Sequence, residues 1–224
     1  MDLGDRMKNY EAAYEFKVIP RCPAIVRVDG RAFHSMLRGC QKPFDATVGD
    51  AMDSVAMSLL SEIQGSRFAY VQSDEASILL IDYNKFNSDQ WFGGSVQKMA
   101  SVSASISSRA FSMAFGRPAD FDSRVFSIPE RDVANYFVWR QRDATRNSVQ
   151  MVARSLYSHS QCLNKNASEL QEMIFQKGQN WDSLAPYWKR GRVVTTDTNT
   201  PVKECPIFSN EPGFITKFMS IEEE

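Results

Sequence analysis

The stretch Ile25-Val26-Arg27-Val28-Asp29-Gly30-Arg31 decides the fold that the sequence predicts. Its β-branched apolar residues are typical of a buried strand, and this strand ends at an aspartate followed by a glycine. A second strand-like run, residues 67–81, contains two adjacent acidic residues, Asp74 and Glu75. If one sheet contains both strands, it brings the two acidic points together, and their carboxylates can then hold divalent metal ions.

Helical and strand patterns alternate around these two strands. Apolar residues recur at helical spacing over about 45–63 and 95–115, and strands are expected at 25–29, 67–72, 76–81 and 124–128. The order β-α-β-β-α-β across residues 24–128 is the ferredoxin-like pattern of an α+β fold. We expect an amphipathic helix at 5–17 before this unit, and a mainly helical extension after it.

Composition limits the classes of protein that this chain can be. The 224 residues carry a formal net charge of −1 and a pI of about 6.2, so nucleic-acid binding would need a local basic patch. The four cysteines are scattered without a CxxC pair, which argues against a zinc site and against a disulfide framework. No apolar run approaches a membrane span, and the charged N-terminus does not resemble a signal peptide. We expect a cytoplasmic protein with no membrane partner.

The acidic points suggest a metal-dependent reaction. Two aspartates on adjacent strands can bind two Mg²⁺ ions, one activating an attacking hydroxyl and the other neutralising a triphosphate. The carbonyl of Gly30 could add a further oxygen ligand. The alternative is that Asp29-Gly30 is a simple turn and Asp74-Glu75 an exposed hairpin tip, and short motifs alone leave this open.

Basic residues favour a phosphate ligand. Arg27, Arg31 and Lys42 surround Asp29 in the sequence, and guanidinium groups bind phosphate with bidentate geometry. A solvated salt-bridge cluster would have the same pattern. Lys98 and Arg124 stand singly among small or apolar residues, so each either points inward at an anion or lies on the surface.

Two other features allow two interpretations each. His34 could contact a base or phosphate, or cap a turn. Residues 181–192 combine aromatic and basic side chains, which could stack on bases and bind phosphates, or could form the packed end of a helix with a solvated basic tip.

A series of motifs, in order, resembles the tRNA-His guanylyltransferase family over roughly residues 5–195. The motifs are Val26 to His34, Lys42-Pro43, Gln72-Ser73-Asp74-Glu75, Lys98, Phe121 to Val125, Asn135 to Gln141, and Lys189-Arg190-Gly191. The resemblance implies a polymerase palm-like domain at 1–130, with a helical extension and C-terminal tail at 131–224 packed on it. It also implies nucleotide addition in the 3′-to-5′ direction and a homotetramer.

The resemblance further implies roles for individual residues. Asp29, Asp74 and the Gly30 carbonyl would bind two Mg²⁺ ions, with Glu75 beside them as a third catalytic carboxylate. The substrates would be tRNA with ATP and GTP or other nucleoside triphosphates. Residues that would contact nucleotide are Arg27, Arg31, His34, Lys42, Asp45, Ser73, Lys98, Arg124 and Asn147. Residues that would contact tRNA are Arg140, Lys189 and Arg190.

One departure from the family pattern bears on the substrate. Members that act on tRNA-His carry a His-Ile-Asn-Asn segment where this chain has Thr145-Arg146-Asn147-Ser148, and an expected arginine is replaced by Ser95. The chain therefore resembles the guanylyltransferase-like branch, which repairs truncated tRNA 5′ ends by template-directed addition. Addition of a single G to tRNA-His, a palm-type nucleotide cyclase and a tRNA-binding module without catalysis are the alternatives.

Overall fold

An antiparallel sheet forms the centre of the computed structural model, which describes residues 1–85, 87–198 and 200–220. The strand order is β4-β1-β3-β2-β5-β6. The strands are β1 (Ala24–Gly30), β2 (Ser66–Gln72), β3 (Glu75–Leu80), β4 (Phe121–Ser127), β5 (Arg192–Thr195) and β6 (Pro201–Val202). The order of the first four strands, with a helix after β1 and another after β3, is the ferredoxin-like arrangement, so the predicted fold class is confirmed.

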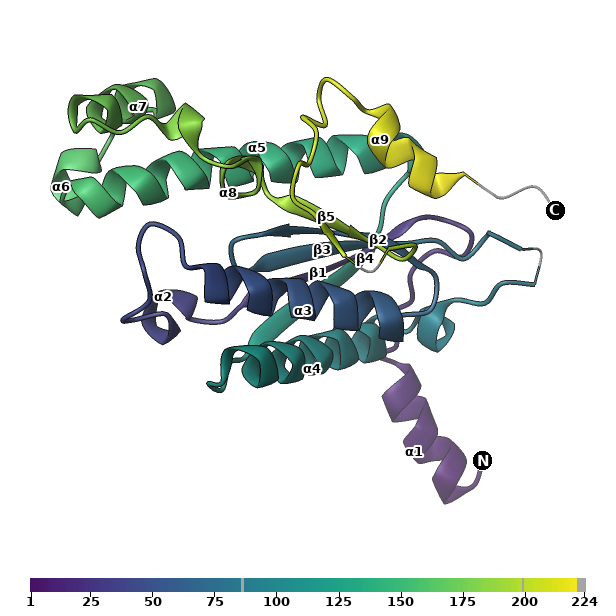
Figure 1. Ribbon diagram of the computed structural model, residues 1–224. Coiled ribbons are helices and arrows are strands. Elements are labelled where there is room, and N and C mark those ends of the chain that lie inside the picture. The colour runs from purple at the N-terminus through teal and green to yellow at the C-terminus, as the bar shows by residue number, and fades with distance from the viewer. Residues whose placement is uncertain (86, 199, 221–224) are drawn as a thin grey trace.

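Two long helices, α3 (Ala46–Glu62) and α4 (Val96–Phe115), cover one face of the sheet (Figure 1). Asp45 caps α3 by accepting a hydrogen bond from the backbone N–H of Thr47, and Gly116 ends α4 in a left-handed conformation. Apolar side chains spaced along α3, such as Met52, Val55 and Leu59, are fully buried against the sheet. This packing fixes α3 beside the loop that follows β1.

Helix α5 (Glu130–Leu156) crosses the opposite face (Figure 1). Its first half packs on the sheet through Val133 and Phe137, together with the C-terminal segments α9 (Gly213–Thr216) and η3 (Lys217–Met219). Its second half extends beyond the sheet and packs through Val149 and Val152 against α7 (Ala167–Gln176). A short helix, α6 (His159–Cys162), lies between them in the sequence. We call α6, α7 and the end of α5 together the α6–α7 lobe.

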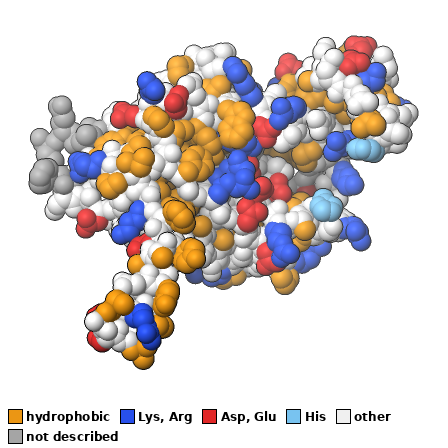
Figure 2. All heavy atoms as spheres, turned by 180° about the vertical axis from the view of Figure 1, so that it is seen from behind, with side chains coloured by type: hydrophobic (Ala, Val, Ile, Leu, Met, Phe, Trp, Pro, Cys, Tyr) orange, Lys and Arg blue, Asp and Glu red, His pale blue; other side chains and the backbone are white. Residues whose placement is uncertain are grey.

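Helix α1 (Leu3–Ala12) is shorter than the predicted 5–17 and projects from the body of the protein (Figure 1). None of its residues is buried. Its apolar side chains therefore lie on the surface, as the orange groups along this helix in Figure 2 show. The predicted amphipathic pattern exists, but within the described chain no surface covers it.

The second half of the chain also contributes to the sheet. Strand β5 pairs antiparallel with β2, with Tyr70 opposite Val193 and Ala69 opposite Val194. Short helical segments complete the fold: α2 (Phe33–Met36), η1 (Trp91–Gly94), η2 (Trp181–Ser183) and α8 (Pro186–Arg190). No helix in the described part of the chain is long and apolar enough to cross a membrane.

Candidate active site

Two rows of charged side chains run across the sheet at the end of β1. Asp29 lies opposite Asp122 of β4 on one side and opposite Glu75 of β3 on the other. Two residues earlier, Arg27 lies opposite Arg124. Directly opposed residues share a face of the sheet, and these side chains lie on the face that α5 only partly covers. Figure 2 shows basic and acidic groups next to one another in the middle of the molecule, on the side turned away from Figure 1.

The turn between β2 and β3 brings Asp74 to the end of β1. The backbone N–H of Gly30 donates to the carbonyl oxygen of Asp74 at 3.0 Å, and Ser73 adopts a left-handed conformation with φ of 48° to make the turn. Asp74 is half-buried in this tip, which is therefore not the exposed hairpin of the alternative interpretation. The structure thus places Asp29, Gly30 and Asp74 together, and we call Asp29 and Asp74 the acidic pair.

The electrostatics of these carboxylates favour a bound cation. Burial, and then the negative charge of Asp29, raise the pKa of Asp74 to about 6. Burial, and then the charge of Asp122, raise the pKa of Asp29. A divalent cation between the two carboxylates would relieve this repulsion.

The donor set fits magnesium better than a metal that needs a closed protein cage. Among the residues that the structure describes, no three His, Cys, Asp or Glu side chains gather closely enough to hold an ion by themselves. Mg²⁺ is usually bound by one or two carboxylates, with waters and substrate phosphates completing its octahedron. Asp29, Asp74 and the Gly30 carbonyl would supply a set of this kind.

Gly30 has a packing requirement as well. A Cβ atom at this position would lie 2.3–2.6 Å from ring atoms of Phe33. The ring of Phe33 packs edge-on against Phe111 and Phe121, so it cannot move aside. A residue with a side chain here would displace the backbone between Asp29 and α2.

Glu75, which was expected beside the metal ions as a third catalytic carboxylate, binds an arginine of α5 in the structure. Its carboxylate accepts two hydrogen bonds from Arg140 of α5, at 2.8 and 3.0 Å, and another from Gln72. Arg140 is only 5% exposed and also pairs with Asp143. In the structure the guanidinium of Arg140 holds α5 to the sheet, and its contact with tRNA stays a prediction. Glu75 likewise directs its carboxylate to Arg140.

Arg27 has a donor available for an anion. Its Nε lies 3.7 Å from Glu75 and is buried without a hydrogen-bond partner in the described part of the chain. A buried donor left unpaired is unfavourable unless a ligand satisfies it. Arg124 and Arg31 are more than half exposed and make loose ion pairs with Asp122 and Asp120, at 3.7 and 3.8 Å.

A cavity of about 400 Å³ lies next to the acidic pair. It is enclosed by the loop that precedes α3, by the turn between β2 and β3, and by the middle of α5. Five residues predicted to contact nucleotide line it: His34, Lys42, Asp45, Ser73 and Asn147. Ser73 directly precedes Asp74, so the cavity reaches the turn that carries this carboxylate.

Several residues of this cavity have no signature in the sequence. Phe44 stacks on Trp188 with ring centroids 4.9 Å apart and planes 10° from parallel. Arg192 is buried between Asp53 and the carbonyl of Gly49, to which it donates at 2.7 Å. These contacts join segments about 140 residues apart, and an isolated aspartate on the apolar side of α3 is the only hint of them in the sequence.

Three predicted site residues lie away from this arrangement. Lys98 is exposed on α4, which covers the other face of the sheet. Lys189 donates to both the side chain and the carbonyl of Asp182, and Arg190 donates to the carbonyl of Cys205. Their roles in binding triphosphate and tRNA stay predictions, and the contacts seen here are internal.

Known proteins share both sequence and fold with this chain. A model of the tRNAHis guanylyltransferase family matches residues 4–129. A bacterial tRNA(His) guanylyltransferase-like protein in complex with ATP is 38% identical and superposes with a TM-score of 0.94, covering 97% of this chain and 99% of that one. A second such structure, in complex with GTP, is 37% identical with a TM-score of 0.88, covering 98% and 99%.

A sequence relative extends the comparison to eukaryotes. tRNA(His) guanylyltransferase 2 of Arabidopsis thaliana is 29% identical over 161 residues, covering 66% of this chain but only 29% of the longer plant protein. The family match spans more than half of the chain, and the structural matches span nearly all of it. The chain therefore belongs to the tRNAHis guanylyltransferase family, whose members are nucleotidyltransferases that act on tRNA.

Proposed function

We propose that the protein repairs 5′-truncated tRNA by template-directed addition of nucleotides in the 3′-to-5′ direction. ATP or GTP would first activate the 5′-phosphate: a phosphate oxygen attacks the α-phosphorus of the nucleotide and pyrophosphate leaves. The 3′-hydroxyl of an incoming nucleoside triphosphate would then attack the activated 5′-phosphorus, and the nucleoside monophosphate would leave as the hydroxyl loses its proton.

The observation that carries this proposal is the cavity that ends at the acidic pair. Its volume suits a nucleotide, and its lining combines the ammonium of Lys42, the hydroxyl of Ser73 and the amide of Asn147. Similar proteins were solved with ATP and with GTP, which supports activation by either nucleotide. The cavity would hold the base and sugar, with the phosphates directed at Asp74.

The chain's own residues would prepare the reacting groups. Asp29, Asp74 and the Gly30 carbonyl would hold two Mg²⁺ ions, which when bound supply charge neutralisation and lower the pKa of a coordinated hydroxyl. Arg27, with its unpaired Nε, and the exposed Arg124 would bind phosphate oxygens beside them. The pair of Glu75 and Arg140 would keep the strands and α5 in register.

The side chains on α5 support repair over addition of one G to tRNA-His. In the segment Thr145-Arg146-Asn147-Ser148, Asn147 and Ser148 line the cavity. The hydroxyl of Thr145 donates to the backbone of α5, and Arg146 pairs with Asp143. The segment thus presents neither an imidazole nor a second amide to the cavity, the groups by which the other branch is distinguished.

A template-swap assay tests the proposal. The substrate is a tRNA lacking its first 5′ nucleotide, with Mg²⁺, ATP and one labelled nucleoside triphosphate at a time. We expect the added nucleotide to change with the opposing base of the 3′ strand, for example from G opposite C to A opposite U. Addition of G whatever the opposing base, and only to tRNA-His, would favour the other branch.

The family resemblance also suggests the state in which the protein works. We propose a homotetramer of chains acting on tRNA in the cytoplasm, each with a palm-like catalytic part at 1–130 and an extension at 131–224. The projecting helix α1 supports assembly, because Leu3, Met7 and Tyr10 on it, and Tyr14 just after it, are 44–69% exposed. Such a stripe is usually covered by another protein surface.

A further inference from the structure

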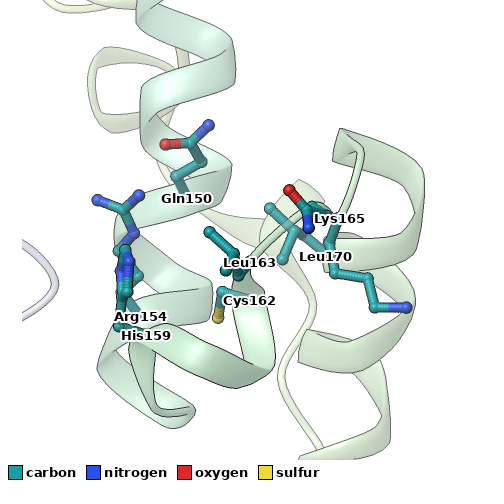
Figure 3. Close-up of a pocket in the computed structure, with 8 residues that line it drawn as sticks. Gln150, Arg154, His159, Cys162, Leu163, Lys165 and Leu170 are labelled. Atoms are coloured by element: carbon teal, nitrogen blue, oxygen red, sulfur yellow. The ribbon is translucent and has the colours of Figure 1, made fainter.

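A second cavity, of about 140 Å³, lies in the α6–α7 lobe, outside the site described above. Figure 3 shows Gln150 and Arg154 of α5 with His159 on one side of it and Lys165 on the other. Cys162, Leu163, Asn164 and Leu170 complete the lining. No acidic side chain lines this cavity, and its polar groups on the α5 side are the guanidinium of Arg154, the imidazole of His159 and the amide of Gln150, all of which can donate to an anion.

Two donor side chains on the α5 side, those of Arg154 and His159, are free to bind a ligand. In the described part of the chain neither of these side chains makes a hydrogen bond or an ion pair, and both residues are exposed. Lys165 differs, because its ammonium donates to Glu169 at 3.1 Å. Residues 142–165 contain four basic side chains and one acidic one, whereas the whole chain carries a net charge of −1. This segment is therefore locally positive, as nucleic-acid binding requires in a chain without a net positive charge.

The cavity has a fixed position relative to the reaction centre. Arg154 lines both this cavity and the nucleotide-sized one, so the two lie on either side of one side chain. Arg140, which holds Glu75 beside the acidic pair, lies fourteen residues earlier on the same helix. At a rise of 1.5 Å per residue, Arg140 and Arg154 are about 21 Å apart along the axis.

We infer that the cavity in the α6–α7 lobe binds a phosphodiester group of the tRNA whose 5′ end lies at Asp29 and Asp74. The inference rests on the proposed function. The cavity has about a third of the volume of the nucleotide-sized one, so it admits a phosphate group but not a whole nucleoside triphosphate. In a stacked strand, with about 3.4 Å per nucleotide, 21 Å corresponds to about six nucleotides. The phosphate would thus belong to the body of the substrate and hold its register.

Variants at His159 test this inference, because His159 lines only the lobe cavity. For His159→Ala we expect about tenfold weaker binding of 5′-truncated tRNA by fluorescence anisotropy, since a hydrogen-bond donor to phosphate is lost. Affinities for ATP, for inorganic phosphate and for a 5′-phosphorylated dinucleotide should be unchanged, because these ligands do not span the two sites.

Two further variants complete the design. His159→Lys keeps a phosphate donor at the cavity and should retain tRNA affinity. The matched control is Lys177→Ala, which removes a cation from the same lobe but outside the cavity, where Lys177 lies over the ring of Tyr157. Its tRNA affinity should stay within twofold of the wild type.

Several results would overturn the inference. They are tRNA affinity of His159→Ala within twofold of the wild type, an equal loss in Lys177→Ala, or no recovery in His159→Lys. A parallel loss of inorganic phosphate binding would mean that the cavity takes free anions instead of RNA. Failure of the proposed function is distinct: the wild type would then add no nucleotide to truncated tRNA, whereas the difference in tRNA affinity between wild type and His159→Ala would persist.

Discussion

Asp74→Asn should stabilise the metal-free protein while abolishing nucleotide addition. The pKa of Asp74 is raised from an ordinary 3.8 to about 6 by burial and by the charge of Asp29. At neutral pH the folded protein therefore carries an unfavourable negative charge, whereas the unfolded chain does not suffer from it. Asparagine keeps the shape of the side chain and its hydrogen-bonding oxygen but removes this charge.

The magnitude follows from the difference between the two pKa values. Each pH unit corresponds to about 1.36 kcal/mol, so a difference of about two gives about 3 kcal/mol for a fully buried group. Asp74 is only half-buried, and solvent screening reduces the gain to about 1.5 kcal/mol. The penalty on the wild type is fully present above about pH 6 and disappears as the pH falls below 3.8, where Asp74 is protonated in both states.

Urea unfolding in the presence of a chelator measures this effect. We expect Asp74→Asn to raise the free energy of unfolding by about 1.5 kcal/mol at about pH 7.5 and by nearly nothing at about pH 4. Asp120→Asn is a matched control, because Asp120 is 78% exposed and its one ion pair among the described residues is with the exposed Arg31. A variant less stable than the wild type at pH 7.5, or a gain independent of pH, would refute the electrostatic account of the acidic pair.

Other perturbations test separate parts of the structure. Arg140→Met removes the two hydrogen bonds that Arg140 donates to the buried carboxylate of Glu75, which keeps the bond from Gln72 and the 3.7 Å contact with Arg27. It should lower the free energy of unfolding by about 3 kcal/mol in urea; a loss below about 1 kcal/mol would contradict the pairing. Lys42→Ala should raise the KM for ATP about tenfold in the activation step with an unchanged thermal midpoint, and an unchanged KM would remove Lys42 from the nucleotide site. Met7→Glu with Tyr10→Glu should reduce the mass measured by light scattering, whereas Lys8→Glu should not; equal masses for all three proteins would exclude α1 from the interface.

The sequence predicts the sheet and the acidic pair because both depend on local patterns. A strand ending in Asp29-Gly30 and a tight turn at Asp74 can meet only if β1 and β3 are neighbours, and the βαββαβ order makes them so. The family match confirms the family resemblance, from which Lys42 and Asn147 were predicted to contact nucleotide. In the structure both residues line the same cavity.

Long-range pairings were not predictable in the same way. Arg140 has the spacing of an ordinary helix residue, and its burial follows only from α5 lying over Glu75, 65 residues away in the sequence. The same holds for Arg192, whose partner Asp53 is 139 residues distant. The predicted end of the first helix, at residue 17, is wrong, because α1 ends at Ala12. The apolar periodicity continues to Tyr14, but the described chain offers no surface against which a further turn could pack.

We propose that Asp29 and Asp74 together hold the metal ions for nucleotide addition to a tRNA 5′ end. It is tested most directly by single-turnover addition to 5′-truncated tRNA as a function of Mg²⁺, comparing the wild type with Asp29→Ala and Asp74→Ala. We predict Mg²⁺-dependent addition by the wild type and a loss of at least about a thousandfold in each variant, corresponding to about 4 kcal/mol, with unchanged circular dichroism. Near-normal addition by either folded variant would contradict the claim.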